Sequence, residues 1–314
     1  MKDSRNRIAG ALYGVAVGDA LGAPLEFMSK EEIARRHGRV TEMIGGGWLN
    51  VEPGEITDDT QMTLAVAEGI ADKPGYPFPA IGHRFVEWME SGPKDIGGTC
   101  GSSIARIASK SHQGATSKDK WHRAARDTAK TNGGRSGGNG ALMRTVYPGL
   151  YYTSKETAAR VAMDIGRMTH WDEKSTEACY LYTTMIHLIT EAVINEDLSK
   201  LLAEMLAGSE YDLVELLSED ETGVMNPTGY VVDSFKCALI CLYTTRTFEE
   251  AVIKAANLGG DADTIAAITG GLAGALYGYG SIPGRWVDTL APTIRTRLDR
   301  LVDAAVKNRE AKCR

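Results

Sequence analysis

Seven glycines repeat at four-residue intervals in two segments near opposite ends of the chain. They are Gly10, Gly14, Gly18 and Gly22 in the first segment, and Gly270, Gly274 and Gly278 in the second. The hexapeptide Ala-Gly-Ala-Leu-Tyr-Gly occurs in both segments. A glycine inside a helix costs about 1 kcal/mol relative to alanine, but glycines aligned on one face let another backbone come close. The pattern therefore predicts two helices that pack along their glycine faces, with the glycines serving packing rather than chemistry.

Most of the chain shows the apolar spacing of amphipathic helices. We predict helices at residues 5–23, 58–72, 79–91, 98–110, 118–130, 141–150, 153–168, 173–194, 196–218, 229–245, 247–257, 262–279 and 284–310. Alternating strand patterns are scarce, and the best short candidate is Val40–Ile44. At about 150 residues per domain the chain could form two domains, but no segment between the helices resembles a linker. We predict an all-α fold, as one compact multi-helix domain spanning residues 1–314.

The balance of charges is slightly acidic, with 35 Lys and Arg against 41 Asp and Glu and a formal net charge of −6. A general nucleic-acid binder, or a protein that binds anionic membranes, would carry a net basic surface. The five cysteines form no Cys-x-x-Cys pair, which favours reduced thiols in the cytoplasm. We identify no secretion signal and no apolar run of about 20 residues. We therefore expect a cytoplasmic monomer without membrane insertion and without a nucleic-acid partner.

Two clusters of carboxylates and hydroxyls stand where predicted helices begin. They are Thr57, Asp58 and Asp59 in the first cluster, and Asp261, Asp263 and Thr264 in the second. Such residues commonly cap the free N–H groups at a helix start, and each cluster alone allows that interpretation. Four carboxylates brought together would repel one another unless cations lay between them. All-oxygen ligands favour Mg²⁺ or Mn²⁺, and the two clusters hold enough oxygens for two ions.

A glycine-rich segment, residues 132–140, precedes the predicted helix at 141–150. The backbone N–H groups of such a turn can cradle a diphosphate, but a flexible surface loop is an equally good interpretation. The sequence contains no GxxxxGK[ST] motif and no GxGxxG after a strand, which argues against P-loop and Rossmann nucleotide sites. HExxH and GxSxG are absent as well, so neither a zinc-protease nor a serine-hydrolase site is expected.

Several motifs, in order along the chain, resemble those of the ADP-ribosylglycohydrolase family. They are residues 18–22 (GDALG), 26–27 (EF), 45–48 (GGGW), 56–60 (ITDDT), 95–97 (DIG), 138–144 (GNGALMR), 169–170 (TH) and 259–264 (GGDADT). The resemblance covers nearly the whole chain and is strongest to the bacterial members that act on dinitrogenase reductase. It implies an all-α fold, a centre of two Mn²⁺ or Mg²⁺ ions, and hydrolysis of the N-glycosidic bond between ADP-ribose and a protein arginine.

The resemblance also implies roles for individual residues. The catalytic pair would be Asp95, the acid and base at the scissile bond, and Glu26, beside the metals. The ligands of the two ions would be Thr57, Asp58, Asp59, Asp261, Asp263 and Thr264. The ADP-ribose would contact Thr99, Gly138, Asn139, Gly140 and His170, with Tyr230 under the adenine.

Two positions depart from the family pattern. Gly98 stands where close relatives tend to carry Asn, and His170 is followed by Trp171 rather than by Pro. Both changes concern the rim of the ligand site, and Trp171 is the one tryptophan that we expect to face a ligand. They therefore affect the choice of modified target more than the reaction.

The expected substrate is an ADP-ribosylated protein, with dinitrogenase reductase as one candidate target, and the expected product is ADP-ribose. Two alternatives stay open. One is an enzyme that releases O-linked ADP-ribose or acts on ADP-ribosylated nucleic acid. The other is a relative that binds ADP-ribose, or has a structural role, without catalysis. The complete TDDT and GGDADT motifs favour an enzyme.

Overall fold

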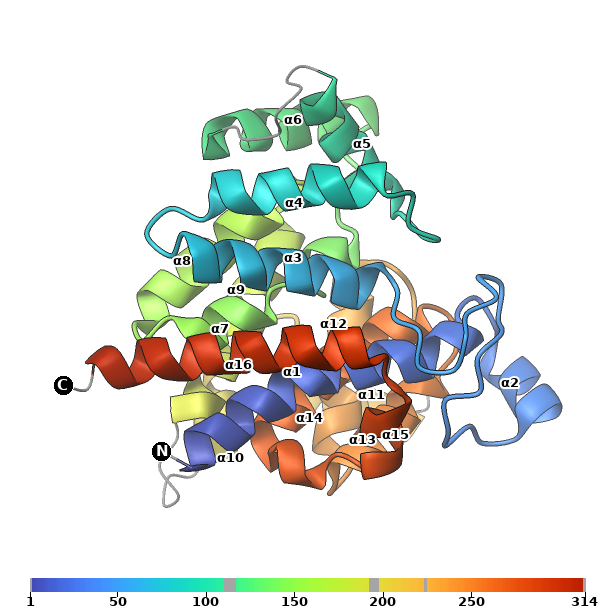
Figure 1. Ribbon diagram of the computed structural model, residues 1–314. Helices are drawn as coiled ribbons and strands as arrows, with labels where there is room; N and C mark the ends of the chain where they lie inside the picture. Colours follow the sequence, from blue (N-terminus) through green and yellow to red (C-terminus); the bar gives the residue numbers. More distant parts are fainter. Residues whose placement is uncertain (1, 110–116, 192–197, 223–224, 313–314) are drawn as a thin grey trace.

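The computed structural model describes residues 2–109, 117–191, 198–222 and 225–312. Within these ranges the chain is helical, and no residue lies in an extended strand (Figure 1). The α-helices are α1 (Lys2–Gly22), α2 (Lys30–His37), α3 (Asp58–Asp72), α4 (Phe78–Glu90), α5 (Gly98–Ala108), α6 (Lys118–Thr131), α7 (Val146–Tyr151), α8 (Lys155–Gly166), α9 (Glu173–Glu191), α10 (Leu198–Leu206), α11 (Leu213–Thr222), α12 (Val231–Tyr243), α13 (Phe248–Ala256), α14 (Ala262–Tyr277), α15 (Gly284–Thr289) and α16 (Pro292–Lys312). Short 3₁₀-helices lie at Ala23–Leu25, Asn139–Ala141 and Tyr279–Ser281. The all-α prediction is confirmed.

Two predicted elements between residues 40 and 150 are wrong. Val40–Ile44 is irregular rather than a strand, because the backbone N–H of Val40 donates to Asn257 Oδ1 at 2.8 Å, and not to a neighbouring strand. The helix predicted at 141–150 begins only at Val146. A 3₁₀ turn precedes it, in which the N–H of Leu142 donates to the carbonyl of Asn139 at 2.7 Å.

Two predicted helices near the C-terminal half are each two helices. The segment predicted at 196–218 divides after Leu206, where Gly208 has a positive φ of 72° that ends α10. The segment predicted at 284–310 divides before Pro292, which lacks an N–H to continue α15 and instead starts α16. Sequence reasoning missed α2, because only Ile33 of this polar helix is buried.

A few predicted details fall outside the described residues. They are residue 110, residues 192–197 at the junction of two predicted helices, residues 223–224 of a predicted loop, and Cys313. The other four cysteines, Cys100, Cys179, Cys237 and Cys241, are buried free thiols. This agrees with the expectation of reduced cysteines for these four.

The two glycine-rich helices, α1 and α14, pack against each other in antiparallel directions at the centre of the molecule. A Cβ atom added to Gly14 would lie 2.0 Å from the carbonyl oxygen of Gly270, and one added to Gly10 would lie 2.1 Å from that of Gly274. Both distances are far below a van der Waals contact, so neither position has room for a side chain. The predicted packing of the glycine faces is confirmed. It brings the end of α1 to the beginning of α14.

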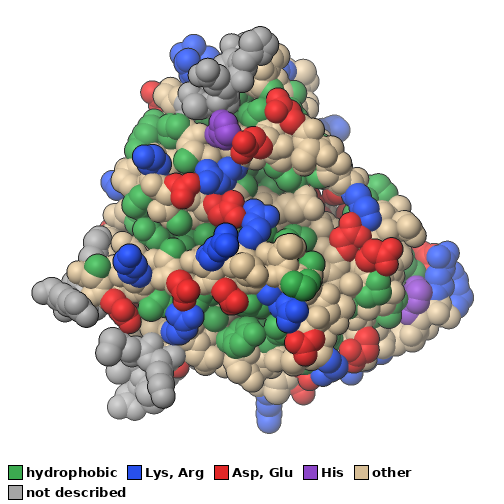
Figure 2. Space-filling model, viewed as in Figure 1, with side chains coloured by type: hydrophobic (Ala, Val, Ile, Leu, Met, Phe, Trp, Pro, Cys, Tyr) green, Lys and Arg blue, Asp and Glu red, His purple; other side chains and the backbone are tan. Residues whose placement is uncertain are grey.

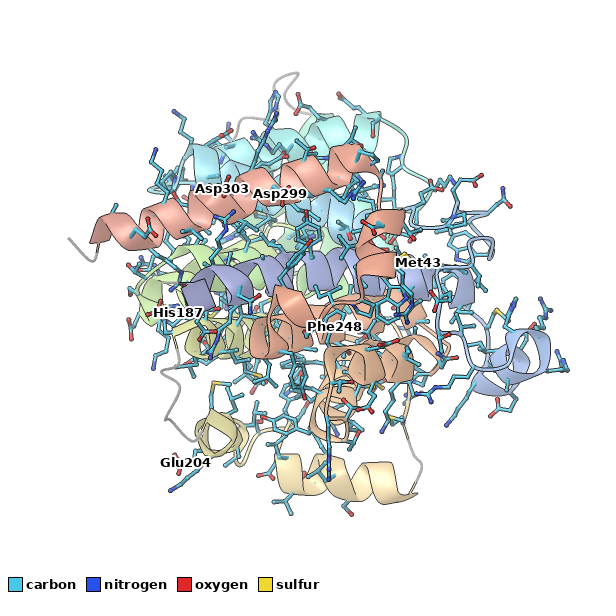
Figure 3. The ribbon with its side chains drawn as sticks, turned by 60° about the horizontal axis from the view of Figure 1, so that its bottom comes forward. Met43, His187, Glu204, Phe248, Asp299 and Asp303 are labelled. Atoms are coloured by element: carbon cyan, nitrogen blue, oxygen red, sulfur yellow. The ribbon has the colours of Figure 1, made fainter. Side chains whose placement is uncertain are left out.

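The remaining helices form layers around this central pair. Toward one end, α3, α4 and the α5–α6 pair follow one another outward from α1 (Figure 1). On the other side, α12 and α13 pack against α14. Helix α16 crosses α1, and its Asp299 accepts a hydrogen bond of 2.8 Å from the hydroxyl of Tyr13 on α1 (Figure 3). Nearly all the buried hydrophobic side chains belong to one continuous cluster, as expected for the predicted single domain.

Segment Asp3–Leu25, which includes α1, is long and apolar enough to cross a membrane, which the sequence reading did not recognise. In the structure, 94% of its most apolar stretch is buried inside the protein. Its apolar character is accounted for by its position as the central helix of the core.

The face in front in Figure 2 carries positive and negative side chains interspersed. Ion pairs on the protein include Arg84 with Asp72 at 2.5 Å and Arg297 with Glu68 at 2.8 Å. Basic side chains do not gather into one patch on this face.

Candidate functional site

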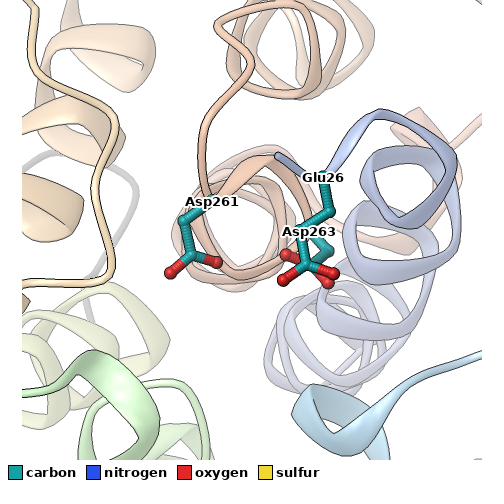
Figure 4. A group of neighbouring side chains, drawn as sticks. All are labelled: Glu26, Asp261 and Asp263. Carbon is teal, nitrogen blue, oxygen red and sulfur yellow. The ribbon is translucent and has the colours of Figure 1, made fainter. Parts of the chain in front are cut away.

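Three carboxylates meet where α1 ends and α14 begins. Glu26, Asp261 and Asp263 each offer an oxygen within 4.8 Å of the others, and their side chains project into the same space (Figure 4). The chain after α1 is held against the chain before α14, because the N–H of Phe27 donates to the carbonyl of Gly260 at 2.7 Å. Gly260 has a φ of +63°, and an added Cβ would lie 1.8 Å from the carbonyl oxygen of Pro227. Only glycine fits there, so this local geometry positions Asp261.

The first acidic cluster, Thr57, Asp58 and Asp59, is held in place by Asp19, a residue of α1. Its fully buried carboxylate accepts hydrogen bonds from the backbone N–H groups of Thr57 and Thr60, and from both threonine hydroxyls. Burial raises the pKa of Asp19 to about 6, against the lowering effect of these hydrogen bonds. Asp19 thereby caps the start of α3 and presents Asp58 and Asp59. Sequence reasoning assigned no role to it, although an Asp inside the apolar segment 8–20 was a signal.

The carboxylates of the two clusters are close enough to repel one another. Burial, followed by the charges of their neighbours, raises the pKa of Asp58, Asp59 and Asp263 well above the usual range. Burial also raises the pKa of Glu26, to about 7. The clusters touch directly, since the hydroxyl of Thr264 donates to Asp59 Oδ2 at 3.3 Å.

This site fits divalent cations on structural grounds. Asp59 Oδ1 is buried without a hydrogen-bond partner, which is unfavourable for a carboxylate oxygen unless a cation satisfies it. Every candidate ligand atom is an oxygen, the preference of hard ions such as Mg²⁺ and Mn²⁺. The group whose oxygens lie close enough to hold one cation is Glu26, Asp261 and Asp263. Asp261 and Asp263 were predicted as ligands and Glu26 as a neighbour of the metals. The roles of Thr57, Asp58, Asp59 and Thr264 as ligands stay predictions.

A cavity of about 400 Å³ opens beside the carboxylates. It unites most of the site residues predicted from the sequence: Glu26, Asp58, Asp95, Thr99, Gly138, Asn139, Gly140, His170, Asp261, Asp263 and Thr264. Thr57 and Asp59 are buried but do not line it. Tyr230 stands outside the lining and is 45% exposed, with its ring beside Gly137.

Asp95 enters the cavity from the segment between α4 and α5. It is half-buried, and burial raises its pKa. Its carboxyl interacts with that of Asp58. Asp95 therefore faces the acidic cluster from the wall of the cavity. Gly98, one of the two departures from the family pattern, has open space around the position of a Cβ atom.

Asn139 connects the glycine-rich segment to the acidic cluster. Its side-chain N–H₂ donates to Asp261 Oδ2 and to the hydroxyl of Ser234, both at 2.8 Å. The backbone of Asn139 is held as well, because its N–H donates to the carbonyl of Gly229 at 3.0 Å. Residues 138–140 of this segment therefore form part of the cavity wall, whereas residues 132–135 are exposed on the surface.

A chain of hydrogen bonds determines which nitrogen of His170 carries a proton. Arg144 is fully buried, and its Nη2 donates to the hydroxyl of Thr169 at 2.6 Å. The Thr169 oxygen lies 2.8 Å from His170 Nδ1. Since a guanidinium can only donate, the hydroxyl accepts from Arg144 and keeps its own hydrogen, which we assign to a bond with Nδ1. Burial, with the charge of Arg144, lowers the pKa of His170 to about 3, so the ring is neutral. With Nδ1 as the acceptor, its N–H is at Nε2.

The Nε2 atom of His170 lies at the glycine-rich wall, where a Cβ added to Gly138 would be 3.1 Å away. His170 is therefore a fixed hydrogen-bond donor at the cavity. Sequence reasoning did not identify Arg144 as the residue that sets this arrangement. A basic residue directly after the apolar run Ala141–Met143 was the available signal.

Trp171 does not line this cavity. Its ring contacts the guanidinium groups of Arg126, at 4.3 Å from the ring centroid, and Arg167, at 5.7 Å, as cation–π pairs. That Trp171 faces a ligand stays a prediction.

Comparisons with known proteins agree with this geometry. A family model described as ADP-ribosylglycohydrolase matches residues 1–314. The chain is 35% identical to an ADP-ribosyl-[dinitrogen reductase] glycohydrolase of Rhodospirillum rubrum, over 95% of each chain. It is 30% identical to the ADP-ribosylarginine hydrolase Tri1 of Serratia proteamaculans, over 92% of this chain and 76% of that one. A solved structure titled ADP-ribosylglycohydrolase-related protein complex superposes with a TM-score of 0.78 and 30% identity, covering 98% and 99% of the two chains.

Proposed function

The chain belongs to the ADP-ribosylglycohydrolase family, and we propose that it hydrolyses the N-glycosidic bond between ADP-ribose and an arginine of a modified protein, with the help of divalent cations. The observation that carries this proposal is the convergence on one cavity of buried carboxylates, a glycine-rich wall and a neutral histidine donor. The two relatives named for ADP-ribosyl-[dinitrogen reductase] and ADP-ribosylarginine support arginine as the leaving group.

The glycine-rich wall suits the nucleotide part of the substrate. Gly138 and Gly140 have no side chains to fill the cavity beside them, so a ligand can come close to their backbone. The Nε2–H of His170 would donate to a phosphate or ribose oxygen at this wall. Tyr230, exposed next to Gly137, offers a ring to the adenine.

The acidic clusters would hold two divalent cations, Mn²⁺ or Mg²⁺. Asp58, Asp261, Asp263 and Thr264 line the cavity and would contribute oxygens there, with Thr57 and Asp59 buried behind them. When bound, such cations polarise ribose hydroxyls and lower the pKa of a nearby water. Asn139 fixes one oxygen of Asp261 by its hydrogen bond, which orients the other oxygen.

Asp95 is the group that we assign to proton transfer. Its raised pKa allows its carboxyl to carry a proton near neutral pH more readily than an exposed Asp. It would donate this proton to the departing guanidine and take one from the attacking water. Glu26, whose pKa is raised to about 7, would also take up or release a proton beside the cations.

The test is release of ADP-ribose from three substrates side by side: ADP-ribosylarginine, ADP-ribosylserine and ADP-ribosylated thymidine. We expect release from the arginine substrate in Mn²⁺ or Mg²⁺, and loss of release in excess chelator while circular dichroism stays unchanged. ADP-ribosylated dinitrogenase reductase is the protein substrate to test next. Preference for the serine or thymidine substrate, or full turnover after verified metal removal, would contradict the proposal.

A further inference from the structure

Two exposed aromatic side chains, Phe27 and Trp48, lie beside Glu26, and Phe27 lines the cavity. Phe27, which lines the cavity, is 69% exposed, and Trp48 is 51% exposed. Their ring centroids are 5.2 Å apart, with the planes inclined by 46°. Glu26 lies directly beside them but is only 6% exposed. Two adjacent exposed rings beside a polar cavity offer a contact surface to a ligand.

The backbone of Phe27 is held in an unfavourable conformation. Its φ is +62°, in the left-handed region that side chains other than Gly and Asn rarely adopt. The pairing of residues 27–28 with Gly260 maintains it, through N–H to carbonyl hydrogen bonds of 2.7 and 2.8 Å. Burial of the ring does not compensate for this strain, because the ring is exposed. Strain that persists without a packing reason is typical of ligand sites.

Trp48 is positioned as firmly as Phe27. It stands in a tight loop closed by two backbone hydrogen bonds between Gly46 and Val51. The loop packs closely on Pro24, since a Cβ added to Gly47 would lie 2.8 Å from it. The indole Nε1–H donates to Glu26 Oε2 at 2.6 Å. The edge of the ring is thus tied to the carboxylate while much of the side chain remains open.

The charges around these rings select the class of ligand. The carboxylates of Glu26, Asp95 and Asp261 line the same cavity as Phe27, so a cation is attracted to its mouth. A guanidinium is planar, weakly hydrated and stacks on aromatic faces. A nucleotide phosphate would be repelled here, and the glycine-rich wall is the place that suits it.

We propose that Phe27 and Trp48 form a platform that binds the guanidinium of the substrate arginine, and so select arginine-linked over hydroxyl-linked ADP-ribose. This inference rests on the proposed function and adds the residues that recognise its leaving group. A serine or threonine linkage has no positive charge to interact with the rings. The platform therefore increases affinity for one linkage and not for the other.

The first experiment replaces the ring of Phe27 without disturbing the backbone. Asn tolerates a left-handed φ, so Phe27→Asn removes the ring alone. We expect KM for ADP-ribosylarginine to rise about tenfold, equal to about 1.4 kcal/mol, with the Kd for ADP-ribose unchanged. Tyr180→Leu, which removes an exposed ring of α9 outside the cavity, should leave KM unchanged. An unchanged KM in Phe27→Asn, or an equal loss of ADP-ribose affinity, would overturn the proposal.

Two variants of Trp48 distinguish the role of its ring in the platform from the role of its hydrogen bond to Glu26. Trp48→Phe keeps a ring but removes the N–H, so we expect mainly a lower kcat. Trp48→Leu removes both, and KM for ADP-ribosylarginine should rise as well. If both variants raised KM equally, the hydrogen bond and not the ring face would be responsible, which contradicts the platform.

A binding measurement tests the platform independently of turnover. In saturating ADP-ribose, butylguanidinium is titrated while tryptophan fluorescence is recorded, and uncharged butylurea serves as its matched control. Wild-type protein should bind butylguanidinium about tenfold more tightly than Phe27→Asn does. It should also bind butylguanidinium more tightly than it binds butylurea. Equal binding by both proteins would refute the platform. Failure of wild-type protein to release ADP-ribose from arginine would instead contradict the proposed function.

Discussion

The carboxylate of Asp19 accepts hydrogen bonds from both the backbone N–H and the hydroxyl of Thr57, at 3.0 and 2.8 Å, across 38 residues of sequence. The first residue belongs to the central helix α1, and the second precedes α3. This contact links the packing of the core to the orientation of the acidic cluster. A change at Asp19 should therefore affect stability and metal affinity together.

Asp19→Ala should lower the free energy of unfolding by about 3 kcal/mol, because several buried hydrogen bonds to one charged group are lost. Mn²⁺ affinity should fall as well, since the start of α3 is no longer held. Denaturant unfolding and calorimetric Mn²⁺ titration measure the two effects. Asp303→Asn, which removes an exposed ion pair with Arg5, is the control and should change neither by much. Normal Mn²⁺ affinity in folded Asp19→Ala would show that the cap does not organise the site.

Asp261→Ala should abolish turnover and weaken metal binding, because Asp261 belongs to the group of three converging carboxylates. Asp95→Ala should leave metal binding close to wild type and mainly lower kcat, because Asp95 comes from the separate segment between α4 and α5 and we assign it to proton transfer. Metal titration and steady-state kinetics of both variants distinguish the two roles. Loss of metal from Asp95→Ala, or near-normal rates in Asp261→Ala, would show that the roles are assigned wrongly.

Gly274→Leu should destabilise the protein by about 3 kcal/mol, at the upper end for overpacking. Even the Cβ atom would lie 2.0 Å from the carbonyl oxygen of Gly10. This oxygen belongs to the backbone of α1, so it cannot move aside as a flexible side chain would. Metal affinity should fall too, because Glu26 follows the end of α1 and Asp263 stands at the start of α14, so a shift of these two helices moves both carboxylates. Gly284→Ala, with open space around its Cβ, is the matched control. Thermal unfolding that is equal in the two variants would contradict this prediction.

Thr169→Val should change the tautomer of His170, because the hydroxyl that donates to Nδ1 is lost. Side-chain ¹⁵N spectra of histidine-labelled protein should show the Nε2–H form in wild type and a mixture in the variant. Affinity for ADP-ribose should fall about fivefold, and Thr169→Ser should restore both. An Nδ1–H signal in wild-type protein would disprove the hydrogen-bond assignment.

His170 should also make stability depend on pH. Its folded pKa of about 3 lies below the ordinary value of 6.5, so the unfolded chain binds the extra proton first. The charged group that acts on it, after burial itself, is Arg144. Stability from the neutral ring is present above pH 6.5 and decreases as the pH falls toward 3.

The comparison of wild type with His170→Gln isolates this effect, because the acidic clusters titrate alike in both proteins. Between pH 7 and pH 5 the wild type should lose about 2 kcal/mol more than the variant, at about 1.4 kcal/mol for each pH unit below 6.5. Urea unfolding at the two pH values measures the difference. Equal losses would mean that His170 is not held neutral.

Local sequence patterns determined the helices, because helical periodicity and capping act between residues three or four positions apart. The same spacing revealed the glycine faces of α1 and α14, and from them the meeting of Glu26 with Asp261. The errors arose where local signals are weak. Helix α2 has one buried apolar residue, and the ends of α10 and α15 depend on a single Gly208 or Pro292.

The tertiary structure alone decided how distant polar groups pair. The partners of Asp19, of Asn139 and of Arg144 are 38, 122 and 25 residues away, and no periodicity encodes such contacts. Only the packed chain leaves Phe27 exposed with a positive φ beside Trp48. Hydrogen bonds of this kind depend on burial and on exact distance, which arise when the helices assemble. The sequence thus supplied the reacting groups, and the packing of α1 against α14 decided which of them face one another.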